Sequence, residues 1–469
     1  MKKLLIIGGG MSGFCAAIRA AQLACDRQIA LKIQLVDLNQ QSLRKVKAAG
    51  NGRCNLSNNS IDIAHYVSAA GKVNQRLFHT VCNSFAKRRE EFLRDLELPL
   101  FYDTAGRAYP LSEQGAVVVE KLRNFAASLG VEICTATKVE KISSNGDKFR
   151  IDFSQIETDK SNSVATKNIE SSDVYDFVIL ACGTPAAPQL GSSSSIVDFA
   201  EQLGFSIQSF TPCLVPLCAE WPSPKMEKSD KFIKVKTPRN RSERLRYQLD
   251  GTRFKGEATL YLQRDHIEQI SVSSGEFQIT DYGLSGIAAM DLSCALVPYL
   301  EGQQLTAELF LSINFVPSLS TTYLREWLRR SFAGLYEDKF DCDSRTTAQS
   351  EIEKRRRCAA IFSSFTKASI AEYLAARVDF RDPIASAEQL LHNFHLPLQG
   401  VLDFSRAQVC AGGIKSNLLQ TNLSFKQYPN LFACGEVIDI VGHTGGYNLH
   451  WAMASGYFVG ESLIDSVEA

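Results

Sequence analysis

The first glycines of the chain have the spacing of a loop that binds the phosphates of a dinucleotide. They form the pattern Gly8-x-Gly10-x-x-Gly13. Gly8 would permit a tight turn, Gly10 would let a pyrophosphate approach the backbone, and Gly13 would let a helix pack closely on a strand. Farther along, Asp37 could accept hydrogen bonds from the adenosine ribose and would repel a 2′-phosphate. The pattern favours a dinucleotide site over a purely structural turn, without separating FAD from NAD.

A second loop, at residues 47–58, alternates glycine with polar residues and contains the run GNGRCN at 50–55. Such a segment makes a poor helix or strand. Arg53 could pair with a phosphate, while Asn51 and Asn55 offer both donors and acceptors. We therefore predict a loop that wraps a ligand, with a well-capped surface loop as the alternative.

Buried elements must hold the first loop in place. Residues 4–7 form a continuous apolar run, as expected of a strand in a parallel sheet. An alanine-rich helix is expected over 14–23, and a second strand over 30–36 ends at Asp37. The order strand, glycine loop, helix, strand and acid is that of a Rossmann-type nucleotide-binding unit.

The end of the chain carries a second candidate site. A short apolar strand at 430–434 runs into Gly435-Glu436, which places a carboxylate where the hydroxyls of a cofactor could donate to it. Gly445-Gly446 then opens a helix that we expect over 447–464. Another buried strand, expected at 176–183, returns the chain to the same sheet before a long insertion. This late return favours FAD, because an NAD dehydrogenase would carry its nicotinamide half on the contiguous second half of the sheet.

These motifs resemble those of the HI0933-like flavoproteins, also described as BaiN or aminoacetone-oxidase-type FAD-binding enzymes. The run at 50–55 is the most distinctive motif of that family. The further matching segments are 106–112, 182–192, 214–217, 280–286 and 435–449. The resemblance spans both chain ends and implies FAD, a two-dinucleotide-binding flavoprotein fold and oxidoreductase chemistry.

The expected cofactor-binding residues follow from the glycine loops and from this resemblance. They are Gly8, Gly10, Met11, Ser12, Gly13, Asp37, Lys47, Asn51, Gly52, Arg53, Cys54, Asn55, Val139, Ala181, Cys182, Gly183, Gly435, Glu436, Asp439, Gly445, Gly446, Tyr447 and Asn448. By the same resemblance, the start of the C-terminal helix would face the flavin and stabilise the negative charge that reduction places there.

The catalytic residue stays unknown at this level. His443, Tyr447 and His450 follow the flavin motif closely enough to be proton donors, and Cys54 could be a redox-active thiol. The chain departs from the family pattern at Ser193-Ser194-Ser195-Ile196, Gly204-Phe205 and His443. For this reason we carry over neither a catalytic residue nor a second nucleotide site.

The expected fold is α/β, with a Rossmann-like FAD-binding domain of the two-dinucleotide-binding flavoprotein type formed by residues 1–190 and 396–469. An inserted β-barrel-like subdomain is expected at 191–315 and a helical subdomain at 316–395. The barrel strands are expected at 232–235, 258–262, 269–273 and 305–311. The polar segment 155–172 is expected to form a loose hairpin or loop.

Composition narrows the class of protein. The 51 basic and 51 acidic residues balance, so the whole chain has no attraction to nucleic acid or anionic membrane. The 13 cysteines are scattered without a C-x-x-C pair, so we expect no disulfides. His392-x-x-His395 has no nearby Cys or Asp to complete a ligand set, so we also expect no metal site. The apolar start is too short for a signal peptide, and no apolar run approaches the ~20 residues of a membrane helix. We therefore expect a cytoplasmic protein without a membrane partner.

The leading interpretation is an FAD-dependent oxidoreductase that passes hydride between the flavin and a small organic substrate, with NAD(P)H as a possible transient electron donor. Residues 225–255 hold eleven basic side chains against four acidic ones. Because of that run, a flavin-dependent enzyme that modifies tRNA or another nucleic acid stays an alternative. We favour the interpretation that these basic residues form the solvated face of exposed strands, and we do not favour nucleic acid as a partner. The third alternative is a non-catalytic flavin redox sensor. The sequence does not predict the oligomeric state.

Overall fold

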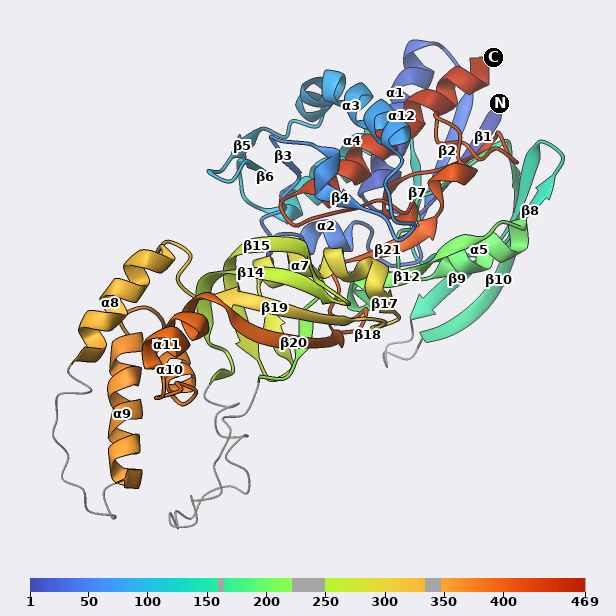
Figure 1. Ribbon diagram of the computed structural model, residues 1–469. Coiled ribbons are helices and arrows are strands. Elements are labelled where there is room, and N and C mark those ends of the chain that lie inside the picture. The colour runs from blue at the N-terminus through green and yellow to red at the C-terminus, as the bar shows by residue number, and fades with distance from the viewer. Residues whose placement is uncertain (159–163, 222–248, 334–346, 469) are drawn as a thin grey trace. The chain divides into compact units, whose positions relative to one another are not determined.

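The computed structural model describes residues 1–158, 164–221, 249–333 and 347–468 (Figure 1). The chain forms two compact units. The first holds Met1–Leu214 with Asp403–Ala469, and the second holds Val215–Leu402. The boundaries that we expected after residues 190 and 395 therefore differ from those of the units. The barrel and the helices that we expected as separate subdomains share the second unit.

A parallel sheet with the strand order β22-β11-β1-β2-β7 forms the centre of the first unit. Its strands are β1 (Lys2–Ile7), β2 (Leu31–Val36), β7 (Glu132–Cys134), β11 (Phe177–Leu180) and β22 (Leu431–Ala433). All residues of β11 and β22 are buried, as expected for strands covered on both faces. The parallel pairing of β22 with β11 places a strand from the C-terminal part of the chain in the same sheet as β1, the first strand.

Two helices of this unit, α1 (Met11–Asp26) and α12 (Tyr447–Glu468), lie side by side. Glycines on α12 permit this close approach. A Cβ atom on Gly456 would lie 2.2 Å from the backbone oxygen of Ser12, and one on Gly460 would lie 2.7 Å from that of Ala16. The small residues of the C-terminal helix therefore serve helix–helix packing.

The first unit also contains further helices and small sheets. The helices are α2 (Arg44–Ala48), α3 (Gln75–Asp95), α4 (Gly115–Ser128) and α5 (Ser195–Leu203). The additional strands are β3 (Ser57–Asn58), β4 (Tyr66–Val67), β5 (Leu100–Tyr102), β6 (Arg107–Pro110), β8 (Thr137–Asn145), β9 (Lys148–Thr158), β10 (Val164–Tyr175), β12 (Ile207–Cys213), β21 (Val409–Ile414) and β23 (Val441–Gly442). Of the hairpin or loop expected at 155–172, the hairpin agrees with the structure, because β9 and β10 pair as antiparallel strands.

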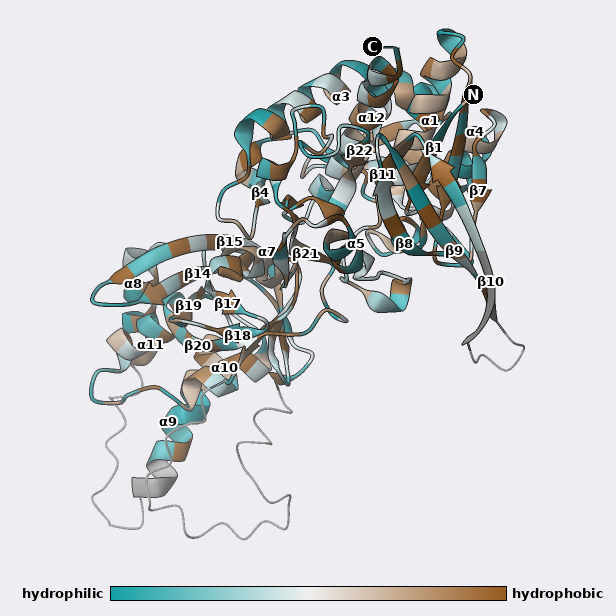
Figure 2. Cartoon of the chain, turned by 90° about the vertical axis from the view of Figure 1, so that its right-hand side faces the viewer, coloured by the Kyte–Doolittle hydropathy of each residue, from teal (hydrophilic) through white to brown (hydrophobic). Residues whose placement is uncertain are grey.

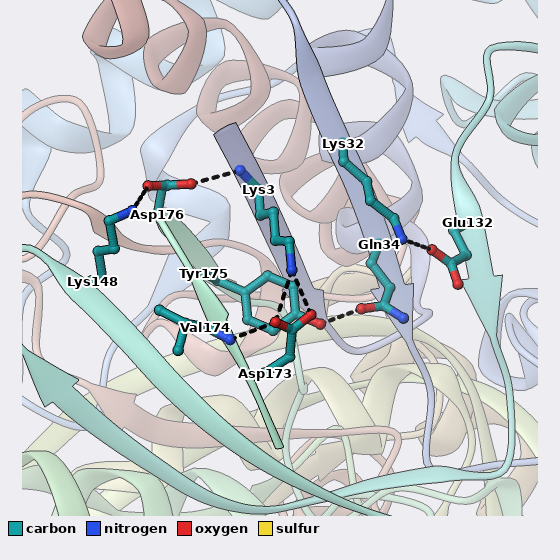
Figure 3. Close-up of polar contacts among 9 residues, drawn as sticks. All are labelled: Lys3, Lys32, Gln34, Glu132, Lys148, Asp173, Val174, Tyr175 and Asp176. Atoms are coloured by element: carbon teal, nitrogen blue, oxygen red, sulfur yellow. Dashed lines mark hydrogen bonds and ion pairs between the residues drawn. The ribbon is translucent and has the colours of Figure 1, made fainter. Parts of the chain in front are cut away.

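Ion pairs join neighbouring strands of the first unit at its surface (Figure 3). Lys3 of β1 reaches Asp173 of β10 at 2.8 Å. Lys32 of β2 pairs with Glu132 of β7 at 2.9 Å. These pairs are half exposed, so we expect each to add little to stability.

The second unit contains a closed six-stranded barrel. The order is β13-β16-β15-β14-β19-β20, and pairing of β20 with β13 closes it. The strands are β13 (Leu217–Ala219), β14 (Arg253–Gln263), β15 (Ile267–Thr280), β16 (Gly283–Ser285), β19 (Glu308–Asn314) and β20 (Phe394–Val401), with β17 (Leu300–Glu301) and β18 (Gln304–Leu305) attached. Figure 2 shows hydrophilic and hydrophobic residues along both β14 and β15, and β14 alternates between more and less buried positions, as a barrel wall requires.

The helices of the second unit are α7 (Ile287–Leu296), α8 (Thr321–Ala333), α9 (Thr347–Phe362), α10 (Ala368–Ala375) and α11 (Pro383–His392). The strands predicted at 258–262 and 269–273 lie within β14 and β15, and the run 305–311 reaches into β19. The predicted strand at 232–235 and most of the basic run at 225–255 lie outside the described residues. In the described part of the chain, every helix is too short or too polar to cross a bilayer.

Candidate functional site

A cleft of about 340 Å³ lies in the first unit, where strands β1, β2 and β11 end. The carboxyl ends of parallel strands are the usual place for ligands in such sheets. The walls combine the first glycine loop, the turn after β2, helix α2 and the start of β8 with the turn after β11, the serine-rich segment 192–195 and Glu436.

The space beside Gly10 of the glycine loop is open to a ligand, whereas Gly8 and Gly13 lie directly against backbone atoms of the protein. A Cβ atom on Gly8 would lie 2.2 Å from the backbone oxygen of Ala181, and one on Gly13 would lie 2.0 Å from that of Gly8. A Cβ atom on Gly10 would meet no protein atom within 4 Å. Gly10 also precedes α1 without a side-chain cap, so the first N–H groups of that helix are available to an anion.

Asp37 lies at the end of β2 with 8% of its surface exposed. Its carboxylate accepts hydrogen bonds from the backbone N–H groups of Gly9 at 3.1 Å and Asn39 at 2.7 Å. Burial raises the pKa of Asp37 above its usual value, and these hydrogen bonds oppose the shift. A buried carboxylate beside an open backbone cradle fits the adenosine and diphosphate portions of FAD.

An ion pair that the sequence did not suggest lies in the same cleft. Nζ of Lys45 is 2.6 Å from Oε2 of Glu436, and both side chains are largely buried. Helix α2 begins after Leu43, whose φ is +64°. Its residue Lys45 lines the cleft, whereas Lys47 is exposed and lies outside the cleft wall. The start of this short helix determines which lysine faces the cleft, and no sequence signal marked that start.

The second glycine loop meets the C-terminal motif directly. In the orientation that satisfies its amide, the Asn55 side chain accepts a hydrogen bond from the N–H of Gly446 at 3.0 Å and donates to the backbone oxygen of Ser57 at 3.0 Å. Nδ2 of Asn58 donates to the backbone oxygen of Gly445 at 3.0 Å. Two motifs far apart in the sequence are thus fastened to each other, at residues that lie outside the cleft wall.

Arg53 and Cys54 of this loop also lie away from the cleft wall. The Arg53 guanidinium pairs with Glu113 and lies 4.4 Å from the ring centroid of Tyr109. Cys54 is fully buried, and burial raises the pKa of its thiol to about 12. A protonated, inaccessible thiol argues against the redox role considered from the sequence.

Asp439 and Asn448 hold loops together. The carboxylate of Asp439 accepts hydrogen bonds from the Ser68 hydroxyl and the Gly412 N–H, both at 2.7 Å, and from two further backbone N–H groups. Asn448 accepts from the N–H of Gly442 at 2.8 Å and donates to its oxygen at 2.7 Å. The side chains of Asp439 and Asn448 therefore make their hydrogen bonds to groups of the protein itself.

The structure thus divides the expected cofactor residues into two groups. Those that line the cleft are Gly8, Gly10, Met11, Ser12, Asp37, Val139, Ala181, Cys182, Gly183 and Glu436. Those that lie outside its wall are Gly13, Lys47, Asn51, Gly52, Arg53, Cys54, Asn55, Gly435, Asp439, Gly445, Gly446, Tyr447 and Asn448. The lining residues that the sequence analysis missed include Asn39, Arg44, Lys45, Thr137 and Phe199.

The three candidate proton donors have different surroundings. His450 is buried, and desolvation lowers its pKa to about 3, so its ring is neutral at pH 7. Tyr447 is buried with its ring stacked on His65 at a centroid distance of 4.5 Å. His443 is half-buried. Within the described residues, no cluster of three or more His, Cys, Asp or Glu side chains could hold a metal ion.

Comparison with known proteins places the chain among flavoproteins. The family model described as HI0933-like protein Rossmann domain matches residues 2–462. The chain is 28% identical to the 3-dehydro-bile acid delta(4,6)-reductase of Clostridium scindens, over 99% of this chain and 100% of that protein. It is 23% identical to the ribosomal RNA dihydrouridine synthase of Escherichia coli, over 98% of this chain and 97% of that protein.

Among solved structures, the quinol fumarate reductase FrdA of Escherichia coli aligns with the whole of this chain and 71% of its own, at 13% identity and a TM-score of 0.46.

Proposed function

The chain belongs to the HI0933-like family and is an FAD-dependent oxidoreductase; from this premise we propose that it reduces a carbon–carbon double bond conjugated to a carbonyl group in a small organic substrate. NAD(P)H is the proposed electron donor. The observation that carries the cofactor part is the cleft, where an open glycine cradle, an uncapped helix start and a buried carboxylate meet.

The substrate class rests on the chemistry that the names of two relatives share. A 3-dehydro bile acid with a delta(4,6) system has double bonds conjugated to a ketone. The 5,6 double bond of uridine, whose reduction gives dihydrouridine, is likewise conjugated to a carbonyl. In the reaction that we propose, hydride adds to the double-bond carbon remote from the carbonyl and a proton adds to the other carbon of that double bond.

The chain has three tasks in such a reaction. The N–H groups that follow Gly10 bind the diphosphate, and Asp37 accepts hydrogen bonds from the ribose. FAD, when bound, supplies the two-electron hydride chemistry. We propose that His443 delivers the proton to the substrate, because it is half-buried, whereas the other two candidates, Tyr447 and His450, are buried.

Turnover with a panel of substrates tests this proposal. Purified protein with FAD and NADH or NADPH is incubated without oxygen with cyclic enones, including steroid enones, and with their saturated counterparts. Consumption of NAD(P)H that depends on the enone, with the saturated ketone as product, supports the proposal. An FAD-loaded protein that reduces none of the enones would refute the substrate class and leave the cofactor in place.

A second candidate is reduction of uridine in ribosomal RNA. It is favoured by the match to the Escherichia coli dihydrouridine synthase over nearly the full length of both proteins and by the basic run at 225–255. Dihydrouridine formed in a ribosomal RNA fragment, together with binding that weakens steeply with salt, would favour this candidate over the small-molecule substrate.

A further inference from the structure

The ion pair between Lys45 and Glu436 places a carboxylate next to the expected diphosphate position. Glu436 follows Gly435, and a Cβ atom on Gly435 would lie 2.3 Å from the hydroxyl oxygen of Ser12 in the first turn of α1. Glu436 itself lines the cleft together with the glycine loop. A negative side chain therefore stands close to the helix start that is suited to bind two phosphates.

A bare carboxylate at this position would oppose the binding of a diphosphate, because like charges a few ångströms apart repel strongly in a partly buried site. Among the described residues, the one ion pair of Glu436 is with Lys45, at 2.6 Å. The side chains are 29% and 21% exposed, so solvent screens this pair less than the half-exposed pairs of Figure 3.

We propose that Lys45 is a cofactor-positioning residue that neutralises Glu436 and so allows the FAD diphosphate to bind beside a carboxylate. The inference rests on the FAD site described above. In this arrangement Glu436 keeps its capacity to accept hydrogen bonds from cofactor hydroxyls, and Lys45 removes its repulsion of the phosphates. The role belongs to Lys45 because Glu436 pairs with Lys45, whereas Arg44, which also lines the cleft, bonds to Asn39 and Gln189.

The test is the FAD dissociation constant of flavin-free protein, followed by the quenching of flavin fluorescence. Lys45→Met should weaken FAD binding at least about tenfold, because it leaves Glu436 uncompensated. Lys45→Arg should bind within about threefold of the wild-type protein, because it keeps the positive charge. In a Glu436→Gln background, adding Lys45→Met should weaken binding by less than about threefold, because the carboxylate that Lys45 neutralises is then absent.

Lys32→Met is the matched control. It breaks a lysine–glutamate pair of the same unit outside the cleft and should leave FAD binding unchanged. Wild-type affinity in Lys45→Met would refute the role of Lys45. A loss from Lys45→Met in the Glu436→Gln background as large as its loss in the wild-type background would also refute it, because the lysine would then act independently of Glu436. Wild-type protein that fails to bind FAD would instead refute the cofactor assignment itself.

Discussion

The hydroxyl of Ser57 lies 2.8 Å from Nδ1 of His450, and this contact joins the second glycine loop to the C-terminal helix. His450 is 2% exposed, and the centroid of its ring lies 5.7 Å from that of Phe85 on α3. Desolvation keeps the ring neutral and lowers its pKa to about 3. The contact therefore fastens two motifs together, and the histidine is unsuited to proton transfer at neutral pH.

Stability should depend on pH through His450. The unfolded chain binds a proton at His450 below pH 6.5, whereas the folded chain does so only near pH 3. The contribution of the neutral ring is therefore complete above pH 6.5 and falls as the pH drops toward 3, by up to about 1.4 kcal/mol per pH unit. His450→Gln removes this term, so the stability gap between the two proteins should narrow on acidification. Urea unfolding at pH 7.5, 5.5 and 4.5 measures it, and a constant gap would contradict the buried neutral ring.

Two glycines of the first loop should respond oppositely to alanine. Gly13→Ala places a methyl group against the backbone oxygen of Gly8 and should destabilise the flavin-free protein by about 1–3 kcal/mol. Gly10→Ala meets no protein atom and should keep the unfolding free energy within about 0.5 kcal/mol. The methyl group of Gly10→Ala should nevertheless weaken FAD binding at least about tenfold, because it occupies the diphosphate cradle. Unchanged FAD affinity in Gly10→Ala would place the cofactor elsewhere.

The thiol of Cys54 should be unreactive toward alkylating reagents in the folded protein. Its buried thiol has a pKa of about 12, so the reactive thiolate is scarce at pH 7.5. Iodoacetamide should label the exposed Cys25 and leave Cys54 unmodified, as mass spectrometry of the peptides would reveal. Cys54→Ala should retain turnover within about threefold. Rapid labelling of Cys54 in the folded protein would restore the redox interpretation of the GNGRCN loop.

His443 should influence turnover more than cofactor binding. If it delivers the proton, His443→Gln should lower kcat by about 100-fold, the lower range for a general acid, while the flavin spectrum stays unchanged. His65→Gln is the matched comparison, because its ring neighbours that of His443 at a centroid distance of 6.2 Å. An equal loss in both variants, or loss of flavin from His443→Gln, would indicate a structural role.

Local patterns allowed much of this architecture to be predicted from the sequence. The apolar run before Gly8, the glycine spacing and Asp37 all lie within a single strand–helix–strand unit, and each was expected at its observed position. The apolar strand at 430–434 indicated that the chain end returns to the first sheet, and the family resemblance implied the cofactor. Such features depend on neighbouring residues or on motifs with a fixed order.

The remaining features depend on contacts between distant segments. The carboxylate of Asp439 is satisfied by Ser68 and Gly412, which no local pattern connects to it. Lys45 lies in the cleft wall and pairs with Glu436, which follows 391 residues later in the chain, whereas Lys47 lies outside that wall. Closure of the barrel by β13 and β20 similarly joins strands that are far apart in sequence.

An absorbance spectrum of the purified protein, followed by anaerobic addition of NADH or NADPH and then of a cyclic enone, tests the central claim most directly. The account predicts flavin absorption near ~450 nm that bleaches with the nicotinamide and returns with the enone. A colourless protein that also fails to take up added FAD would contradict it.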